Sequence, residues 1–235
     1  RLEAMNTKKL SIFGDSIFKG VQLDENSKYV VKDELEFNLI ASDAGYSMEN
    51  FSKFGCTVTK AWDYFQKASD KIKADIVLMD FGGNDCDFEW KEIANYPMGV
   101  HRPKTEFFSY VETYNNMVDS MLSYGIMPIV ATLVPIQGDM YIDYKCKTFG
   151  LEHADIMKWL GKIERIERFQ QMYSDAVIGL SSTRDVPLFD IRSIFTNSKS
   201  AKSMMCQDGI HPNSYGQKAI SDSFKSFMKG FLLTA

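Results

Sequence analysis

Short apolar runs alternate with longer amphipathic segments along the whole chain. The runs at residues 9–13, 76–79 and 128–133 are almost unbroken, which is typical of strands that are buried on both faces of a parallel sheet. Shorter runs near residues 46–51 and 186–189 complete a set of five predicted strands. Five strands that alternate with helical segments predict an α/β fold, in which helices cover both faces of a parallel sheet.

The segments between these runs are predicted to be helices, with two long exceptions. Helices are expected over residues 32–42, from Thr57 or Thr59 to Asp70, and over 105–123, 154–178 and 213–230. Residues 86–104 and 136–151 contain glycine, proline and aromatic residues in no helical order, and we predict that both are loops, the first with one helical turn. Residues 28–31 favour a short additional strand. No repeat or linker interrupts the pattern, so a single domain is predicted over residues 1–235.

Composition and charge exclude several classes of protein. The chain is 45% hydrophobic and 25% charged, its net charge is -4, and no stripe of Lys and Arg argues for nucleic acid as a partner. No apolar run reaches the ~18 residues of a membrane helix, so no membrane span is predicted. The first ten residues lack the apolar segment of a signal peptide, which favours a cytoplasmic location. Residues 1–4 are interpreted as a cloning remnant, with Met5 as the native start. The composition does not fix the oligomeric state.

The four cysteines do not predict a metal site. They form no C-x-x-C pair, and none has a histidine at the spacing of a zinc ligand. The expectation is therefore reduced thiols, with no metal and no cofactor. Cys56, Cys86 and Cys206 each neighbour a loop that carries candidate chemistry. We interpret them as small residues that fill tight space, with oxidative sensitivity of the site as the alternative.

A serine and a histidine are the strongest candidates for chemistry. Ser16 follows the strand predicted at 9–13, at the carboxyl end where ligands bind in open α/β sheets. A serine nucleophile needs a base, and the base needs an orienting partner. His211 stands three residues after Asp208, and a turn at Gly209 can bring the carboxylate beside the imidazole. The simple alternative for Ser16 is a helix N-cap.

Acyl transfer also requires donors that face the developing oxyanion. Three candidates follow the first, second and third predicted strands of the sheet: the backbone N–H groups of Ser16 and Gly55, and the side-chain amide of Asn84. The loops after parallel strands open on one edge of a sheet, so these groups are expected to converge. Gly45 is the competitor for Gly55, and the residues around Gly55 favour the latter.

Together these segments resemble the motifs of the SGNH (GDSL-type) hydrolase superfamily. They are Gly14-Asp15-Ser16, Gly55, Gly83-Asn84-Asp85 and Asp208-x-x-His211, in the order of that family. The resemblance implies a three-layer α/β/α, flavodoxin-like fold and hydrolysis of esters or thioesters without a cofactor. It also implies a nucleophile at Ser16, a base at His211 and an orienting acid at Asp208, with Ser16, Gly55 and Asn84 as the oxyanion hole. The family often has leucine after the serine, where this chain has Ile17.

The predicted function is therefore hydrolysis of a small-molecule carboxylic ester. The acyl group is expected to be acetyl or another short chain, and a carbohydrate is one candidate for the alcohol. A thioesterase or lysophospholipase would use the same site, and a non-catalytic binding module would share the fold. Asp15 and Asp85 are interpreted as structural acceptors of loop N–H groups. Four aromatic residues of the predicted loops either line a substrate pocket or pack against each other: Trp90, Tyr96, Tyr141 and Tyr144.

Overall fold

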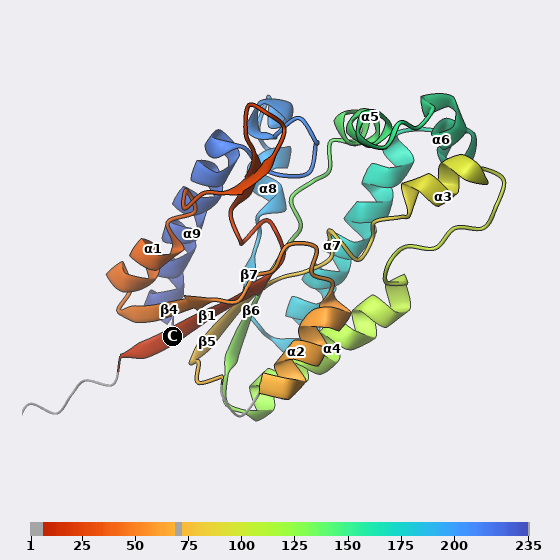
Figure 1. Ribbon diagram of the computed structural model, residues 1–235. Coiled ribbons are helices and arrows are strands. Elements are labelled where there is room, and N and C mark those ends of the chain that lie inside the picture. Colours follow the sequence, from red (N-terminus) through yellow and green to blue (C-terminus); the bar gives the residue numbers. More distant parts are fainter. Residues whose placement is uncertain (1–6, 69–71, 235) are drawn as a thin grey trace, which may run out of the picture.

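The computed structural model describes residues 7–68 and 72–234, and it contains the predicted parallel sheet between two layers of helices (Figure 1). The interpretation of residues 1–4 as a remnant and of Met5 as the start lies outside the described residues. No helix in the described ranges is both long enough and apolar enough to cross a membrane.

The main sheet has five parallel strands, as predicted. In spatial order they are β4 (Tyr46–Asn50), β1 (Lys8–Gly14), β5 (Ile76–Asp80), β6 (Met127–Ala131) and β7 (Leu188–Phe189). The strand order reverses between β1 and β5, where Gly14 lies opposite Asp80. In doubly wound sheets ligands bind at such a reversal, beyond the carboxyl ends of the strands.

Burial on both faces explains why the central strands are almost entirely apolar. In β5, Ile76 and Leu78 pack into the hydrophobic cluster on one face of the sheet. Val77 and Met79 pack into the cluster on the other face. All four side chains are buried, and the one polar residue of the strand, Asp80, stands at its carboxyl end.

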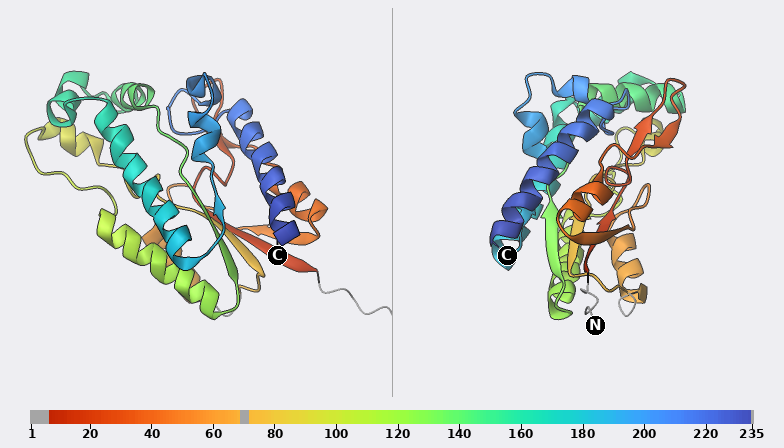
Figure 2. Two further views of the ribbon diagram at one scale, coloured as in Figure 1. Left: turned by 180° about the vertical axis from the view of Figure 1, so that it is seen from behind. Right: turned by 90° about the vertical axis from the view of Figure 1, so that its left-hand side faces the viewer.

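Each face is covered by its own set of helices, which Figure 2 separates clearly in the view from behind. One layer contains α1 (Phe37–Asp43), α8 (Arg192–Thr196) and α9 (Ser214–Thr234). The opposite layer contains α2 (Val58–Ala68), α4 (Phe107–Ser123) and α7 (Glu164–Arg184). A 3-10 turn at Ala201–Met204 leads into the loop before α9.

Two smaller units stand beyond the carboxyl edge of the sheet. Helices α3 (Trp90–Asn95), α5 (Gly138–Phe149) and α6 (His153–Leu160) surround a third hydrophobic cluster. A hairpin pairs β2 (Val21–Leu23) with β3 (Tyr29–Val31). The strand predicted at 28–31 is thus confirmed, while its partner β2 was not predicted.

Two predictions about the second half of the chain are wrong. Residues 136–151 are not a loop, because α5 fills most of this segment. Its glycines mark the ends of the helix: the Gly138 N–H donates to Glu167 Oε1 at 2.9 Å, and Gly150 ends it with a φ of 64°. The single helix predicted at 154–178 is two helices, α6 and α7, because Gly161 between them has a φ of 75°, which no helical residue adopts.

Candidate active site

Ser16 lies in a tight turn directly after β1. The turn is closed by two hydrogen bonds, from Lys19 N–H to the Asp15 carbonyl at 3.1 Å and from Val21 N–H to the Ser16 carbonyl at 3.0 Å. A Cβ on Gly14 would lie only 3.0 Å from the Phe18 side chain, so the strand ends in a residue without one. Ser16 is therefore held at the carboxyl edge, and only 6% of its surface is exposed.

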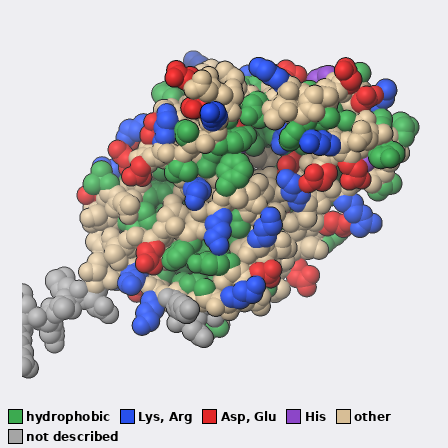
Figure 3. Space-filling model, in the orientation of Figure 1, with side chains coloured by type: hydrophobic (Ala, Val, Ile, Leu, Met, Phe, Trp, Pro, Cys, Tyr) green, Lys and Arg blue, Asp and Glu red, His purple; other side chains and the backbone are tan. Residues whose placement is uncertain are grey.

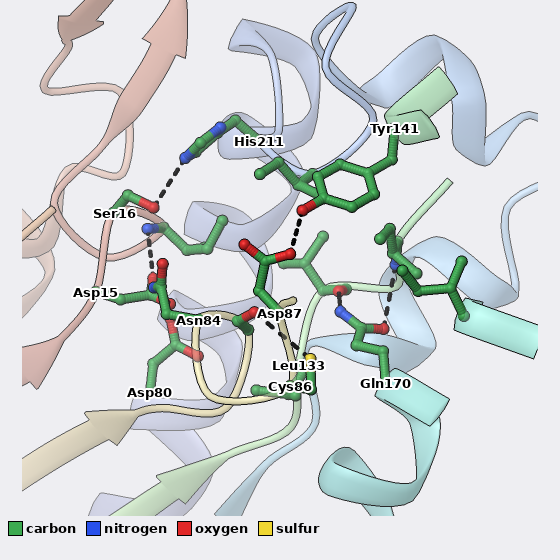
Figure 4. A pocket seen from close by; sticks show the side chains of 16 residues that line it. Asp15, Ser16, Asp80, Asn84, Cys86, Asp87, Leu133, Tyr141, Gln170 and His211 are labelled. Carbon is green, nitrogen blue, oxygen red and sulfur yellow. Dashed lines mark hydrogen bonds between the residues drawn. The ribbon is translucent and has the colours of Figure 1, made fainter. Parts of the chain in front are cut away.

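His211 and Asp208 reach this serine from a loop almost 200 residues further along the chain. His211 Nε2 is 2.8 Å from Ser16 Oγ, and His211 Nδ1 is 2.6 Å from Asp208 Oδ2 (Figure 4 shows the first contact). The other carboxylate oxygen accepts the backbone N–H of His211 at 3.1 Å. Burial by itself would raise the pKa of Asp208, but the hydrogen bond and the charge of His211 outweigh burial and hold this pKa below its ordinary value.

The loop that carries this pair is anchored by α5. The Gln137 N–H donates to the Gly209 carbonyl at 2.8 Å, just before α5 begins. Gly209 has a φ of 70°, and a Cβ there would lie 2.7 Å from the Gln137 carbonyl oxygen. This support was not predicted, because α5 was taken for a loop.

The three predicted oxyanion donors lie on the loops after β1, β4 and β5, as expected from the topology. Within the described ranges, the backbone N–H groups of Ser16 and Gly55 donate to no protein acceptor. The Asn84 side-chain amide donates one hydrogen to Asp15 Oδ2 at 2.9 Å. Gly45 turns the chain before β4, at the opposite end of that strand from Gly55.

Buried carboxyl groups surround this edge of the sheet. Asp15 accepts the N–H of Ile17 at 2.8 Å, and Asp85 accepts that of Val58 at 3.0 Å, so both bind loop or helix backbone as predicted. Burial raises the pKa of Asp15 to about 6 and that of Asp85 to about 7. Asp80 was not predicted, although it ends the most apolar run of the sequence.

Asp80 is the least satisfied of these groups. It is 3% exposed, and its Oδ2 has no hydrogen-bond partner among the described residues. Burial and then the charge of Asp15 raise the pKa of Asp80 well above its ordinary value. Both causes disfavour a negative charge on Asp80 beside Asp15.

A small cavity of about 70 Å³ extends from Ser16 and His211 between Leu133, Ile136 and Tyr141. Figure 3 shows a hollow in the upper part of the front face, and Figure 4 shows Tyr141 and Leu133 on the side of the cavity away from Ser16. This volume is about twice the ~30 Å³ that one molecule of liquid water occupies. The cavity can therefore hold a group of a few heavy atoms.

One wall of the cavity is polar. Asp87 accepts hydrogen bonds from the Tyr141 hydroxyl, from Trp90 Nε1 at 3.0 Å and from Lys104 Nζ at 2.9 Å. Burial would raise the pKa of Asp87, but the charges of Lys145 and Lys104 and the Tyr141 hydroxyl outweigh it, so this pKa lies below its ordinary value. The wall thus holds a fixed carboxylate whose hydrogen bonds are satisfied.

Two of the four aromatic candidates, Tyr141 and Trp90, have the expected roles. Tyr141 lines the cavity and packs against Trp90, with ring centroids 5.9 Å apart. Tyr96 is 70% exposed, and it neither lines the cavity nor packs against the other three rings. Tyr144 lies outside this cavity, near the side chain of Tyr29.

Two further aromatic rings, which were not predicted, cover the catalytic candidate His211. The ring of Tyr29, in β3, lies 5.2 Å from the imidazole, and that of Phe54 is stacked on it at 6.1 Å with an interplanar angle of 15°. Phe54 directly precedes Gly55, so its position next to the glycine was the available signal.

The cysteines near the site are buried thiols. Cys86 lines the cavity, and Cys56 and Cys206 lie in the neighbouring loops. Burial raises the pKa of Cys56 to about 11 and raises those of the other two as well, which disfavours the reactive thiolate. Among the described residues, no three His, Cys, Asp or Glu side chains are grouped so that they could hold a metal ion.

Comparison with known proteins shows the family and the fold. A family model described as the GDSL-like lipase/acylhydrolase family matches residues 12–219. The chain is similar to the crystal structure of a lipase/acylhydrolase from Enterococcus faecalis, with a TM-score of 0.68, 17% identity, and coverage of 95% of this chain and 96% of that one. It is also similar to an acetylxylan esterase from Geobacillus stearothermophilus, with a TM-score of 0.65, 16% identity and 94% coverage of both chains. No curated protein matches.

Proposed function

The chain belongs to the GDSL-like lipase/acylhydrolase family, and we propose that it is a serine esterase that hydrolyses carboxylic esters with short acyl groups. The observation that carries the proposal is the chain of contacts from Ser16 through His211 to Asp208, at 2.8 and 2.6 Å. A serine needs such a base and such an orienting carboxylate to act as a nucleophile at neutral pH.

In the first half of the reaction, Ser16 Oγ attacks the ester carbonyl carbon while His211 Nε2 takes the hydroxyl proton. Asp208 stays ionised because its pKa is held low, accepts the hydrogen bond of the His211 Nδ1–H and stabilises the imidazolium. The imidazolium then gives its proton to the leaving oxygen. The C–O bond of the ester breaks, the alcohol departs, and the acyl group remains on Ser16.

In the second half, water attacks the acyl carbon and His211 takes one of its protons. The bond from the acyl carbon to Ser16 Oγ breaks, His211 returns the proton to Oγ, and the acid leaves. In both halves the negative charge on the carbonyl oxygen is stabilised by the N–H groups of Ser16 and Gly55 and by the second amide hydrogen of Asn84. The amide keeps its direction because its first hydrogen bonds Asp15.

The size of the cavity supports a short acyl group. About 70 Å³ beside Ser16 is enough for an acetyl group or a slightly longer one, which supports a short acyl group over the long chain of a lysophospholipid or of a fatty acyl thioester. The similarity to an acetylxylan esterase supports an acetyl ester, with a carbohydrate as one candidate alcohol. A thioester with a short acyl group would use the same machinery.

A fluorophosphonate probe, with the adduct mapped by mass spectrometry, tests the proposal. We expect labelling at Ser16 that is lost in Ser16→Ala and strongly reduced in His211→Ala. With p-nitrophenyl esters, we expect acetate to be cleaved with a higher kcat/KM than octanoate, and Ser16→Ala to lower kcat by about 10⁴ or more. A folded protein that is neither labelled nor active would support the non-catalytic binding module instead.

A further inference from the structure

A second cavity lies beside the proposed oxyanion glycine. It has a volume of about 260 Å³, Gly55 forms part of its wall, and it lies between the loop after β4 and helix α2. Its other walls are largely aromatic and include Phe51, Phe54 and Tyr64. It is larger than the cavity at Ser16, and nothing in the proposed reaction has yet used it.

Two lysines line this cavity without a carboxylate partner. In the part of the chain that the structure describes, neither Lys53 nor Lys60 has an acidic side chain within 4.0 Å, and no acidic residue lines the cavity. Lys53 Nζ instead lies 3.9 Å from the centre of the Tyr64 ring. In Figure 3 basic side chains gather over the middle of the front face, below the hollow, with few acidic ones between them.

Two acidic groups lie near this cavity without lining it. The charges of Asp15 and Asp85 raise the pKa of the Cys56 thiol. The charges of Lys53 and Lys60 lower it, so all four groups lie near this thiol. Both carboxyl groups are buried and are already bound to backbone N–H groups. They are not free to pair with the two lysines.

The reaction itself indicates which part of the substrate reaches this cavity. The leaving oxygen must come within about 3 Å of His211 Nε2 to receive its proton. The ring of Phe54 is stacked on the imidazole and also lines the second cavity. An alcohol that extends from His211 along the Phe54 ring would enter this cavity, and the acyl group would then take the smaller space beside Leu133 and Tyr141.

We propose that the cavity walled by Phe54 and Tyr64 is the binding site for the alcohol part of the ester, and that Lys53 and Lys60 select alcohols that carry a carboxylate. The aromatic walls pack against a ring or other apolar body of the alcohol, and the two ammonium groups pair with its charge. The inference rests on the proposed esterase function, because it places the alcohol by its proton transfer from His211.

The test compares acetyl esters that differ in the charge of the alcohol. Phenyl acetate is the neutral substrate, and 3- and 4-acetoxybenzoate carry the carboxylate at two positions. In the double variant Lys53→Gln, Lys60→Gln we expect kcat/KM for at least one acetoxybenzoate to fall about 3- to 10-fold, mainly through KM, as the loss of two partly exposed ion pairs predicts. Phenyl acetate should change less than about 2-fold. Salt at ~0.5 M should weaken the preference of the wild type, because it screens exposed charges.

Lys67→Gln is the matched control, since Lys67 is an exposed lysine in the last turn of the same helix, α2, and does not line the cavity. Lys67→Gln should leave kcat/KM unchanged for phenyl acetate and for the acetoxybenzoates. Equal losses for phenyl acetate and the acetoxybenzoates in the double variant, or no loss for either, would overturn the proposed alcohol site.

A failure of the esterase proposal can be distinguished from a failure of this one. If Ser16→Ala still hydrolyses phenyl acetate, the proposed nucleophile is wrong, whatever the lysines do. The site can then be tested without turnover, by calorimetric binding of 3- and 4-hydroxybenzoate to Ser16→Ala. We expect a Kd that the two added lysine substitutions raise about 3- to 10-fold, and an unchanged Kd contradicts the proposal.

Discussion

Replacement of Asp85 by asparagine should change how the stability of the protein depends on pH. Asp85 is completely buried after β5, and its two carboxylate oxygens lie 3.0 and 3.1 Å from the N–H of Val58, the first residue of α2. Burial raises its pKa to about 7, in spite of the hydrogen bonds from Thr105 and Val58. An asparagine side chain at this position would keep the shape and one acceptor for Val58, but it cannot ionise.

The sign follows from the two pKa values. In the unfolded chain an aspartate has a pKa of about 3.9, so between about pH 4 and pH 7 the folded protein holds a proton that the unfolded chain has released. This contribution to stability is complete below pH 4 and is lost as the pH rises through 7. A pKa difference of about 3 corresponds to about 4 kcal/mol in total, of which about 2.5 kcal/mol is lost between pH 5 and pH 8.

Urea denaturation at pH 5 and pH 8 measures the effect in the wild type, in Asp85→Asn and in the control Asp63→Asn, which removes an exposed carboxylate from α2. Between the two pH values we expect Asp85→Asn to lose about 2.5 kcal/mol less of its unfolding free energy than the wild type, and Asp63→Asn to follow the wild type. If asparagine weakens the contact with Val58, the unfolding free energy of the variant falls by the same amount at both pH values. An equal gap between Asp85→Asn and the wild type at pH 5 and pH 8 would refute the reasoning.

Two further predictions concern the loop of Asp208. Asp208→Asn should lower kcat for p-nitrophenyl acetate by about 10²- to 10⁴-fold, because the imidazolium of His211 loses its carboxylate, and steady-state kinetics with a near-native kcat would contradict this. Gly209→Ala should lower both Tm and kcat, because a Cβ would lie 2.7 Å from the Gln137 carbonyl oxygen. Gly45→Ala is its control, since Gly45 also has a positive φ, of 81°, but nothing lies within 4 Å of an added Cβ. That variant should lose only about 1–2 kcal/mol of backbone strain and keep its kcat, and equal losses of activity in the two would argue against the role of α5 in holding the loop.

The strands of the sheet could be predicted from the sequence because each is defined by neighbouring residues. Ile76 to Met79 are apolar in succession, as burial between two helix layers requires, and the structure places them in a central strand. The prediction of a loop over residues 136–151 failed because glycine is common both in loops and at the ends of helices. Gly138 and Gly150 begin and end a helix, and their sequence context alone was equally suited to a loop.

The sequence by itself determined the residue types of the candidate site and the loops on which they stand. Ser16, Asn84 and the pair Asp208 and His211 are encoded in short motifs, in which the residues lie within a few positions of each other. Turns are local, so a carboxylate three residues before a histidine can be predicted to approach it, and the structure has this contact at 2.6 Å.

Only the tertiary structure decided what surrounds these motifs. The stacking of Phe54 on His211 and the buried Asp80 next to Asp15 each join segments that are far apart in the sequence. Burial and electrostatic interactions depend on distance in space, and residues 16 and 211, which are far apart in the sequence, are in contact in the folded protein. Properties such as a pKa of about 7 for Asp85 or a cavity of about 70 Å³ therefore belong to the folded protein and to no single segment of its sequence.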